Sequence, residues 1–289
     1  MNTIQIEYPL DLPDYELLDA GDGEKLERFH EYKIIRPDPR AIWHKSLKES
    51  VWREADAQFQ RTTSDSGVWQ TKIPPPTPWL FHYKQLSFNL KPTDFKHVGI
   101  FPEQAINWDW MTDQIQGHTP SILNLFAYTG GATIVAAKNG AVVTHVDSSK
   151  SSITWANNNA KHNMISTHNV RWIEDDAVKF VQREIKRGKT YDGLIMDPPR
   201  FGRGSKGEIW KLEEHLPNLI NLCKQILSKN PLFVLINAYT ADLSSLVLKN
   251  LMADLMSDTN GTITFGELTS KESTSGRLLP QGIFARWQR

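Results

Sequence analysis

The chain has 289 residues, of which 39% are apolar, 10% aromatic and 23% charged. These proportions are typical of a folded globular protein and exclude collagen, coiled coils and disordered chains. Lysine plus arginine and aspartate plus glutamate both number 33, so no global charge draws the chain to nucleic acid or to an anionic membrane.

The cysteine content and the apolar runs indicate the cellular compartment of the protein. Cys223 is the only cysteine, which excludes an internal disulfide framework and a thiolate zinc site and fits a reducing compartment. The first residues carry acids where a signal peptide needs basic and then apolar residues, and no apolar run approaches the ~20 residues that cross a bilayer. We expect a cytoplasmic protein without a membrane segment or a bound metal, in an oligomeric state that the sequence leaves open.

Residues 1–90 predict a small N-terminal β domain. Short β-prone runs alternate there with breaks rich in glycine and proline. The runs are Tyr15–Leu18, Lys25–Phe29, Tyr32–Ile35 and Trp79–Phe88. Six of the ten tryptophans lie in the first 110 residues. They are compatible with base stacking, but packing in a small sheet is the more common use of such side chains.

Residues 91–289 predict an α/β domain. Short apolar runs alternate with helical patterns, which is typical of a mostly parallel sheet with helices on both faces. The expected strands are Ser121–Ala127, Ala141–Asp147, Asn169–Ile173, Tyr191–Asp197, Pro231–Ala238, Thr262–Leu268 and Gly282–Trp287. The expected helices are Gly131–Asn139, Lys150–His162, Asp175–Arg187, Glu213–Leu227 and Ala241–Met256.

The first of these strands turns through Phe126, Ala127, Tyr128, Thr129 and Gly130 into a helix. A turn of this kind lets a ligand approach the backbone at the carboxyl end of a strand. Phe126 and Tyr128 occupy positions where a dinucleotide-binding turn needs glycines so that the pyrophosphate can approach the backbone. The Gly-Lys-Ser/Thr ending of a nucleotide-triphosphate-binding loop is also missing. The turn therefore favours an adenosine ligand without a polyphosphate, and an ordinary strand-to-helix turn is the alternative.

Acidic residues follow the second and third strands. Asp147, at the tip of the second strand, is placed to accept both hydroxyl hydrogens of a ribose, and a cap for the helix from Lys150 is the alternative. The third strand leads into Asp175 and Asp176, whose carboxylates can cap the next helix and also accept from an adenine amino group.

The fourth strand leads into Asp197, Pro198 and Pro199. The two prolines fix the backbone, remove two N–H donors and present carbonyl groups at the edge of the sheet. Such a rim can hold a planar acceptor beside a cofactor, with Asp197 accepting a proton or a hydrogen bond.

A glycine-rich segment with cations follows this rim. Arg200, Arg203 and Lys206 can hold the phosphates of an RNA or the carboxylate of a smaller substrate, and Phe201 can cover a base. We expect a mobile loop that closes over the acceptor, with a merely solvated loop as the alternative.

Together these segments resemble class I S-adenosylmethionine-dependent methyltransferases, and more closely the large-subunit ribosomal RNA methyltransferase I and K type family. The resemblance rests on Leu123–Gly131, His145–Ser149 and Asp197–Phe201. It implies a Rossmann-like sheet with an antiparallel last strand, S-adenosylmethionine as cofactor and an RNA base as acceptor. The N-terminal β domain would then support or select that acceptor.

The resemblance also implies roles for single residues. Phe126, Tyr128 and Gly130 would shape the methionine side of the cofactor. Asp147 would hold the ribose, Asp176 would meet the adenine, and Asp197 would face the methyl group. The full set of expected cofactor residues is Phe126, Ala127, Tyr128, Gly130, Asp147, Ser148, Asp176, Ala177 and Asp197.

One feature of the family is missing. Methylation of a pyrimidine at C5 needs a cysteine nucleophile, which relatives place after the fifth strand, where Leu235–Thr240 contains none. Cys223 falls in an apolar helical stripe and is predicted to be a core residue. We therefore expect methylation of an RNA base without a cysteine-dependent C5 mechanism. Methylation of a protein or a small metabolite, and cofactor binding without catalysis, are the alternatives.

Overall fold

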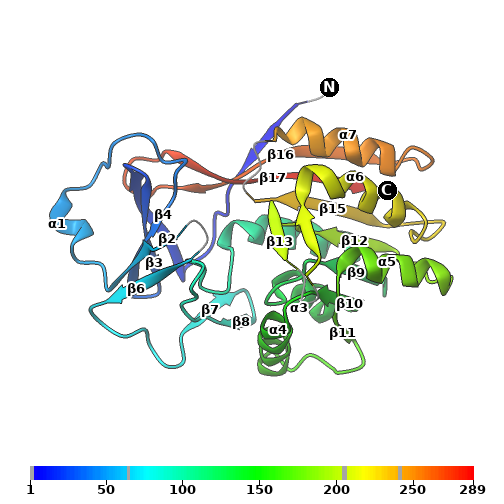
Figure 1. The fold of residues 1–289 in the computed structure, drawn as a ribbon, viewed down its shortest axis with the longest axis horizontal. Helices are drawn as coiled ribbons and strands as arrows, with labels where there is room; N and C mark the ends of the chain where they lie inside the picture. Colours follow the sequence, from blue (N-terminus) through cyan, green and yellow to red (C-terminus); the bar gives the residue numbers. More distant parts are fainter. Residues whose placement is uncertain (1–2, 64–65, 204–206, 240–242) are drawn as a thin grey trace. The chain divides into compact units, whose positions relative to one another are not determined.

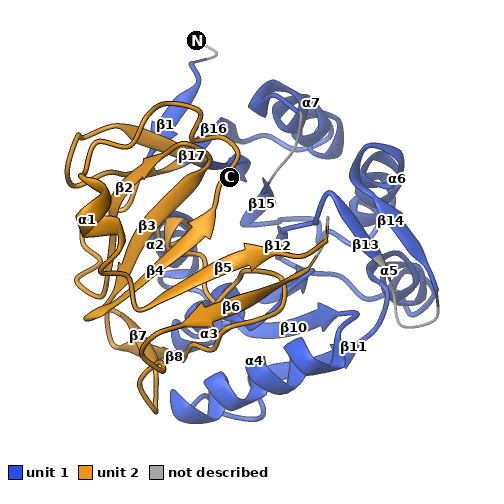
Figure 2. Ribbon diagram, turned by 60° about the vertical axis from the view of Figure 1, so that its left-hand side comes forward, with its two compact units in different colours: residues 1–7, 106–268, 281–289 blue, residues 8–105, 269–280 orange. Residues whose placement is uncertain are grey.

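The computed structural model describes residues 3–63, 66–203, 207–239 and 243–289. The chain forms two compact units (Figure 2). Unit 1 comprises residues 1–7, 106–268 and 281–289, and unit 2 comprises residues 8–105 and 269–280. This division differs from the predicted boundary near residue 90, because the segment up to residue 105 and a stretch of the two C-terminal strands pack with the N-terminal half.

Unit 1 is built on an eight-stranded sheet in the order β1-β16-β17-β15-β12-β9-β10-β11 (Figure 1). Its strands are β1 (Gln5–Glu7), β9 (Ser121–Leu125), β10 (Val142–Asp147), β11 (Val170–Glu174), β12 (Gly193–Met196), β15 (Phe233–Ala238), β16 (Thr262–Lys271) and β17 (Leu278–Gln288). The strands from β15 to β11 run parallel, and β17 is antiparallel to β15. The predicted Rossmann-like sheet with an antiparallel last strand is confirmed. Strand β1, which pairs with β16, was not predicted.

The helices of the chain's α/β half are α2 (Ala105–Ile115), α3 (Gly131–Lys138), α4 (Lys150–His162), α5 (Ala177–Lys186), α6 (Leu212–Lys224) and α7 (Ser245–Leu255). Helix α7 begins later than predicted, because Ser244 caps it by accepting a hydrogen bond from the backbone N–H of Leu246. The first two residues of its predicted range, 241 and 242, lie outside the described residues. Within the described chain, no helix combines the length and the apolar character that a membrane crossing requires.

The core of unit 1 confirms the role predicted for the cysteine. Cys223 is fully buried on the apolar stripe of α6, together with Leu216, Leu219 and Ile220. This stripe packs against the central strands, whose side chains are buried along nearly their whole length. Strand β9 lies between β10 and β12, so the chain order reverses beside it. In an open α/β sheet, ligands bind at the carboxyl ends of the strands at such a point.

Unit 2 holds a five-stranded sheet, β2-β3-β4-β5-β6, and a two-stranded sheet, β7-β8. Its strands are β2 (Tyr15–Gly21), β3 (Glu24–Phe29), β4 (Tyr32–Pro37), β5 (Ala57–Arg61), β6 (Gly67–Thr71), β7 (Leu80–Tyr83) and β8 (Leu86–Asn89), and its short helices are α1 (Glu49–Trp52) and η1 (Pro102–Gln104). The predicted run Trp79–Phe88 forms a hairpin. The six N-terminal tryptophans are all buried or half-buried, as aromatic packing predicts.

Candidate active site

The turn after β9 has an unusual backbone. Phe126, Tyr128 and Gly130 all lie in the left-handed region, with φ of 56°, 49° and 87°. For the two residues that are not glycine, this conformation costs about 1–3 kcal/mol each and persists only where the surroundings enforce it. The backbone N–H of Ala127 donates to the carbonyl of Val146 at 3.1 Å, which ties the turn to β10. Such strained turns cluster at ligand sites.

The two glycines of the turn have a packing role as well. A Cβ on Gly130 would lie 3.0 Å from the Cβ of Ala156, and one on Gly131 would lie 2.7 Å from the ring of Trp108. A side chain at either position would push α3 away from its neighbours, so the sharp entry into this helix requires both glycines.

Asp147 holds this turn from the tip of β10. Its Oδ2 accepts the backbone N–H of Tyr128 at 2.8 Å, and its Oδ1 accepts that of Ser149 at 2.8 Å. Ser149 itself caps α4 by accepting from the N–H of Ser152, so the cap of this helix is not Asp147. Burial raises the pKa of Asp147 despite these two hydrogen bonds. Each carboxylate oxygen keeps a second lone pair with which it can accept from a hydroxyl.

The acids after β11 cap α5, as predicted. Asp176 Oδ1 accepts the backbone N–H of Lys179 at 2.9 Å, and Asp175 Oδ1 accepts that of Asp176 at 2.9 Å. Asp175 also forms an ion pair with Arg183. These contacts fix the cluster at the end of β11.

A pocket joins these strand ends. Of the expected cofactor residues, Phe126, Asp147, Ser148, Asp176 and Ala177 line it. They come from the ends of β9, β10 and β11. The carboxylates offer acceptors for hydroxyl and amino groups, and the aromatic ring offers an apolar face, so the donor set fits the adenosyl part of S-adenosylmethionine.

The other expected cofactor residues do not line this pocket. Ala127, Tyr128 and Gly130 form the turn, and Tyr128 acts there through its backbone N–H. Asp197 is half-buried just beyond β12, and its N–H faces the carbonyl of Leu125 at 3.4 Å.

Asp175, from the predicted acid cluster, also lines the pocket. Four lining residues were not predicted: Val146, Gly202, Glu208 and Trp210. The last three belong to the segment expected to be an irregular loop. It contains instead the antiparallel strands β13 (Phe201–Arg203) and β14 (Ile209–Lys211). The β-prone residues Ile209 and Trp210 are the local signal for a strand in this segment.

The inner face of this hairpin covers the pocket. Trp210 is 7% exposed, and its ring centre lies 4.8 Å from that of Phe126. Its Nε1 donates to the carbonyl of Pro199 at 2.7 Å. Glu208 forms an ion pair with Lys179 at 2.5 Å. These contacts attach the hairpin to both sides of the pocket.

The outer face of the hairpin is exposed and partly apolar. Phe201 is 52% and Ile209 is 54% exposed, and Lys211 pairs with Phe201 in the register. Arg203 lies opposite Ile209 in β13, and Arg200 is exposed, 3.7 Å from Glu213.

Three predicted substrate and catalytic positions complete the description. Lys206 lies outside the described residues. Pro198 is buried, whereas Pro199 is exposed and lines the pocket. The carbonyl of Pro199 accepts from Trp210.

The pocket is small. Its volume is about 50 Å³, whereas small-molecule sites usually measure roughly 300–1,000 Å³. As it stands, the pocket is too small to enclose an adenosyl group.

Comparison with known proteins agrees with this geometry. The model of the S-adenosylmethionine-dependent methyltransferase family matches residues 50–237. The crystal structure of an S-adenosylmethionine-dependent methyltransferase from Agrobacterium tumefaciens is 38% identical, with a TM-score of 0.93 over 98% of this chain and 93% of that one. The structure of SMU.776 complexed with SAH has the same fold, at 19% identity, with a TM-score of 0.74 over 96% of this chain and 76% of that one.

A curated relative is more distant. Ribosomal RNA large subunit methyltransferase I of Aeromonas salmonicida is 27% identical over 168 residues, which are 57% of this chain and 42% of the relative. The chain spans less than half the length of the curated relatives that it matches. S-adenosylmethionine is the cofactor of the matched family, in agreement with the pocket at the strand ends. The chain belongs to the S-adenosylmethionine-dependent methyltransferase family.

Proposed function

We propose that the chain transfers the methyl group of S-adenosylmethionine to a base of RNA by direct attack of the acceptor atom. The observation that carries this proposal is the pocket in which Phe126, Asp147 and Asp176 meet from three neighbouring strand ends. When bound, the cofactor would supply a sulfonium methyl group, whose carbon bonds to the acceptor atom as the carbon–sulfur bond breaks and the neutral thioether leaves. The protein then contributes proximity, alignment and a site with little water.

Each pocket residue has a task in this scheme. Asp147 accepts from the ribose hydroxyls while it holds the Tyr128 backbone. Asp176 accepts a hydrogen bond from the adenine amino group through lone pairs that its helix-cap hydrogen bond does not use. Phe126 and Trp210, whose rings are in contact, offer apolar surface to the adenine once the hairpin moves.

Asp197 is the proposed catalytic residue. It follows β12 directly, and the two prolines that succeed it restrict the backbone on its C-terminal side. Its half-buried carboxylate is suited to accept a hydrogen bond, or a proton, from the acceptor atom as the methyl group arrives. Pro198 and Pro199 hold this rim in place.

The outer face of the hairpin supports RNA as the acceptor. Phe201 and Ile209 expose more than half of their surface, and a base can stack on such side chains. Arg200 and Lys211 add cations there that can meet phosphates, and Arg203 and Lys206 are further cations of this segment in the sequence. The relatives named as ribosomal RNA methyltransferases have acceptors of this class. Unit 2 would support or select the RNA. The cytoplasmic location of the protein remains a separate prediction.

The buried cysteine limits the reaction type. Cys223 is the only cysteine of the chain, is 0% exposed, and has a thiol whose pKa burial raises well above its usual range. It cannot reach a base or supply a thiolate. The acceptor atom must therefore be nucleophilic without covalent activation, which excludes pyrimidine C5 from the proposal.

The test uses cofactor with a labelled methyl group and an extract of cells that lack the gene, so that acceptor sites are unmethylated. The proposal predicts label in the RNA fraction with the wild-type chain, and none with Asp197→Asn, although that variant still binds the cofactor. Label only in protein or in small metabolites would show that the acceptor class is wrong. Cofactor binding without transfer to any fraction would indicate a non-catalytic module.

A further inference from the structure

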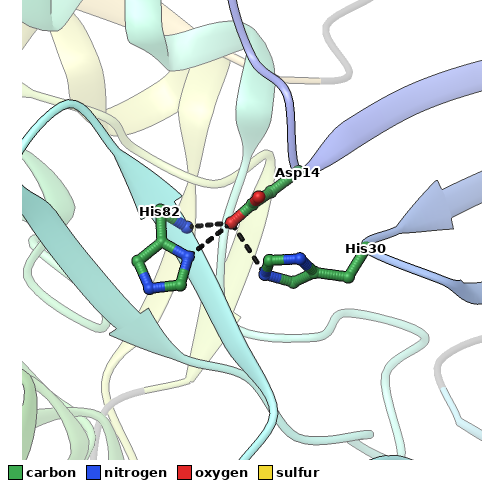
Figure 3. A group of neighbouring side chains, drawn as sticks. All are labelled: Asp14, His30 and His82. Atoms are coloured by element: carbon green, nitrogen blue, oxygen red, sulfur yellow. Dashed lines mark hydrogen bonds and ion pairs between the residues drawn. The ribbon is translucent and has the colours of Figure 1, made fainter.

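Two histidines and an aspartate of unit 2 meet at one point (Figure 3). Asp14 Oδ2 lies 2.8 Å from His30 Nε2 and 2.7 Å from His82 Nδ1. The three side chains come from the segment before β2, the turn between β3 and β4, and strand β7. Their ligand-type atoms all lie within 4.8 Å of one another.

The backbone holds this cluster in place. The N–H of His30 donates to the carbonyl of Asp14 at 2.8 Å, and the N–H of His82 donates to Asp14 Oδ2 at 2.7 Å. His30 also has a φ of 55°, an uncommon conformation for a residue that is not glycine. Each histidine is thus fixed to Asp14 at its main chain as well as at its ring. Metal sites need such preorganised ligands.

The cluster opens onto a pocket of about 620 Å³ within unit 2. Both histidines line it, and their side chains are 41% and 45% exposed, whereas that of Asp14 is 11% exposed. Trp79 lines the same pocket, and its buried Nε1 has no hydrogen-bond partner within the described part of the chain. A ligand or water can therefore reach the histidines from the pocket side.

We propose that Asp14, His30 and His82 bind a divalent transition-metal ion, for which Zn²⁺ is the best fit. Two imidazole nitrogens and one carboxylate oxygen are the usual donors to Zn²⁺, with bonds of about 2.0–2.2 Å, and an open site completes its tetrahedron with water. In a tetrahedron of that size the donor atoms lie roughly 3.3 Å apart. The present separations of 2.7 and 2.8 Å therefore need to widen by only a fraction of an ångström.

Metal binding changes the hydrogen bonds of the cluster in a defined way. Without metal, His30 Nε2 and His82 Nδ1 can each donate a hydrogen bond to the carboxylate of Asp14. With metal, both imidazoles are neutral and carry the proton on the other ring nitrogen, so each presents a lone pair to the ion. The bound ion then links three segments that are far apart in the sequence and stabilises unit 2.

The sequence had predicted no metal site. The three ligands are separated by 16 and 52 residues, from position 14 to 30 and from 30 to 82, and this spacing matches no metal-binding motif. Only the fold brings them together. The inference does not depend on the proposed methyl transfer.

The test uses the full chain without an affinity tag, stripped of metal with a chelator and dialysed. Calorimetric titration with Zn²⁺ should give one site per chain, and Zn²⁺ should raise the melting temperature. The variants His30→Gln and His82→Gln should each weaken binding at least tenfold and abolish the rise. Substituting Co²⁺ should give a visible absorption band that both variants lose.

His44→Gln is the matched control. His44 forms an exposed pair with Asp22 at 2.8 Å in the same unit, but this pair is not part of the three-residue cluster. The His44→Gln variant should therefore bind Zn²⁺ as the wild type does. Circular dichroism checks that each variant folds, and Asp14→Asn provides a further variant that preserves size. Absence of Zn²⁺ binding by the wild-type chain, or equal binding by the folded variants, would overturn the proposal.

Discussion

The Asp147 carboxylate accepts the backbone N–H of Tyr128 at 2.8 Å, and this contact joins the tip of β10 to the left-handed turn after β9. One side chain thus positions the turn and also presents oxygens to the pocket. The strained turn and the expected ribose site are therefore parts of the same arrangement.

Asp147→Ala is expected to weaken S-adenosylmethionine binding while the fold is retained. The lost charge-assisted hydrogen bonds contribute about 1.5–3 kcal/mol, which corresponds to a loss of roughly 10- to 150-fold in affinity. Calorimetric titration measures it. Asp258→Ala, which removes an exposed acid of unit 1, is the control. Unchanged affinity in a folded Asp147→Ala chain would remove this residue from the site.

His145 is expected to make stability depend on pH. Its ring is buried, Nδ1 bonds to Thr133 Oγ1 at 2.9 Å, and burial lowers its pKa from 6.5 to about 3. As the pH falls from 6.5 toward 3, His145 becomes protonated in the unfolded chain but stays neutral in the folded chain. Stability due to this group should therefore fall by up to about 1.4 kcal/mol per pH unit.

Urea unfolding of the wild type and of His145→Gln at several pH values measures this effect. The variant should show a shallower loss of stability on acidification. The exposed His168 provides the control variant His168→Gln, which should behave like the wild type. Parallel pH profiles for wild type and His145→Gln would contradict the prediction.

Cys223→Ser is expected to destabilise the chain by about 1–3 kcal/mol, because it buries a hydroxyl in an apolar core. Methyl transfer per folded molecule should stay unchanged, since the thiol is fully buried and is not expected to contact the substrate. Activity normalised to folded protein measures this, with Cys223→Ala as the companion variant. A covalent adduct of Cys223 with RNA that contains 5-fluoropyrimidine would refute the account.

Phe201→Ala is expected to impair use of the RNA and spare the cofactor. A stacked base contributes about 1–3 kcal/mol, so KM for RNA should rise about tenfold or more, while cofactor affinity stays within about twofold. Leu246→Ala, on α7 and 43% exposed in the wild type, is the control for loss of exposed apolar surface. Equal losses for RNA and cofactor would mean that the hairpin acts only as a structural support.

Replacing Arg203 and Lys206 together with alanine tests the charge of this hairpin. Each lost phosphate contact should flatten the dependence of log Kd on log salt by roughly one unit of slope. Binding to RNA at several salt concentrations measures the slope. An unchanged slope would support a solvated segment without an acceptor role.

The strand ends of unit 1 were predictable because the pattern is local. Buried parallel strands are apolar throughout, so the positions of Asp147 and Asp197 at their ends could be predicted from the apolar runs that precede them. The antiparallel last strand came from the family resemblance and is confirmed by the pairing of β17 with β15.

Features that depend on distant contacts were missed. Strand β1 is only three residues long, and its strand conformation depends on hydrogen bonds to the distant strand β16. The role of Trp210 depends on its contact with Phe126, 84 positions earlier in the sequence. The glycines near it suggested a loop, and the two β-prone residues Ile209 and Trp210 were too few to outweigh them.

Identification of the methylated nucleoside tests the central claim most directly. RNA methylated by the wild-type chain with labelled cofactor is digested to nucleosides, which are separated and analysed by mass spectrometry. The account predicts label on a base at an atom other than pyrimidine C5, and no label with Asp197→Asn. Label on a ribose hydroxyl, label at C5, or no labelled nucleoside would contradict it.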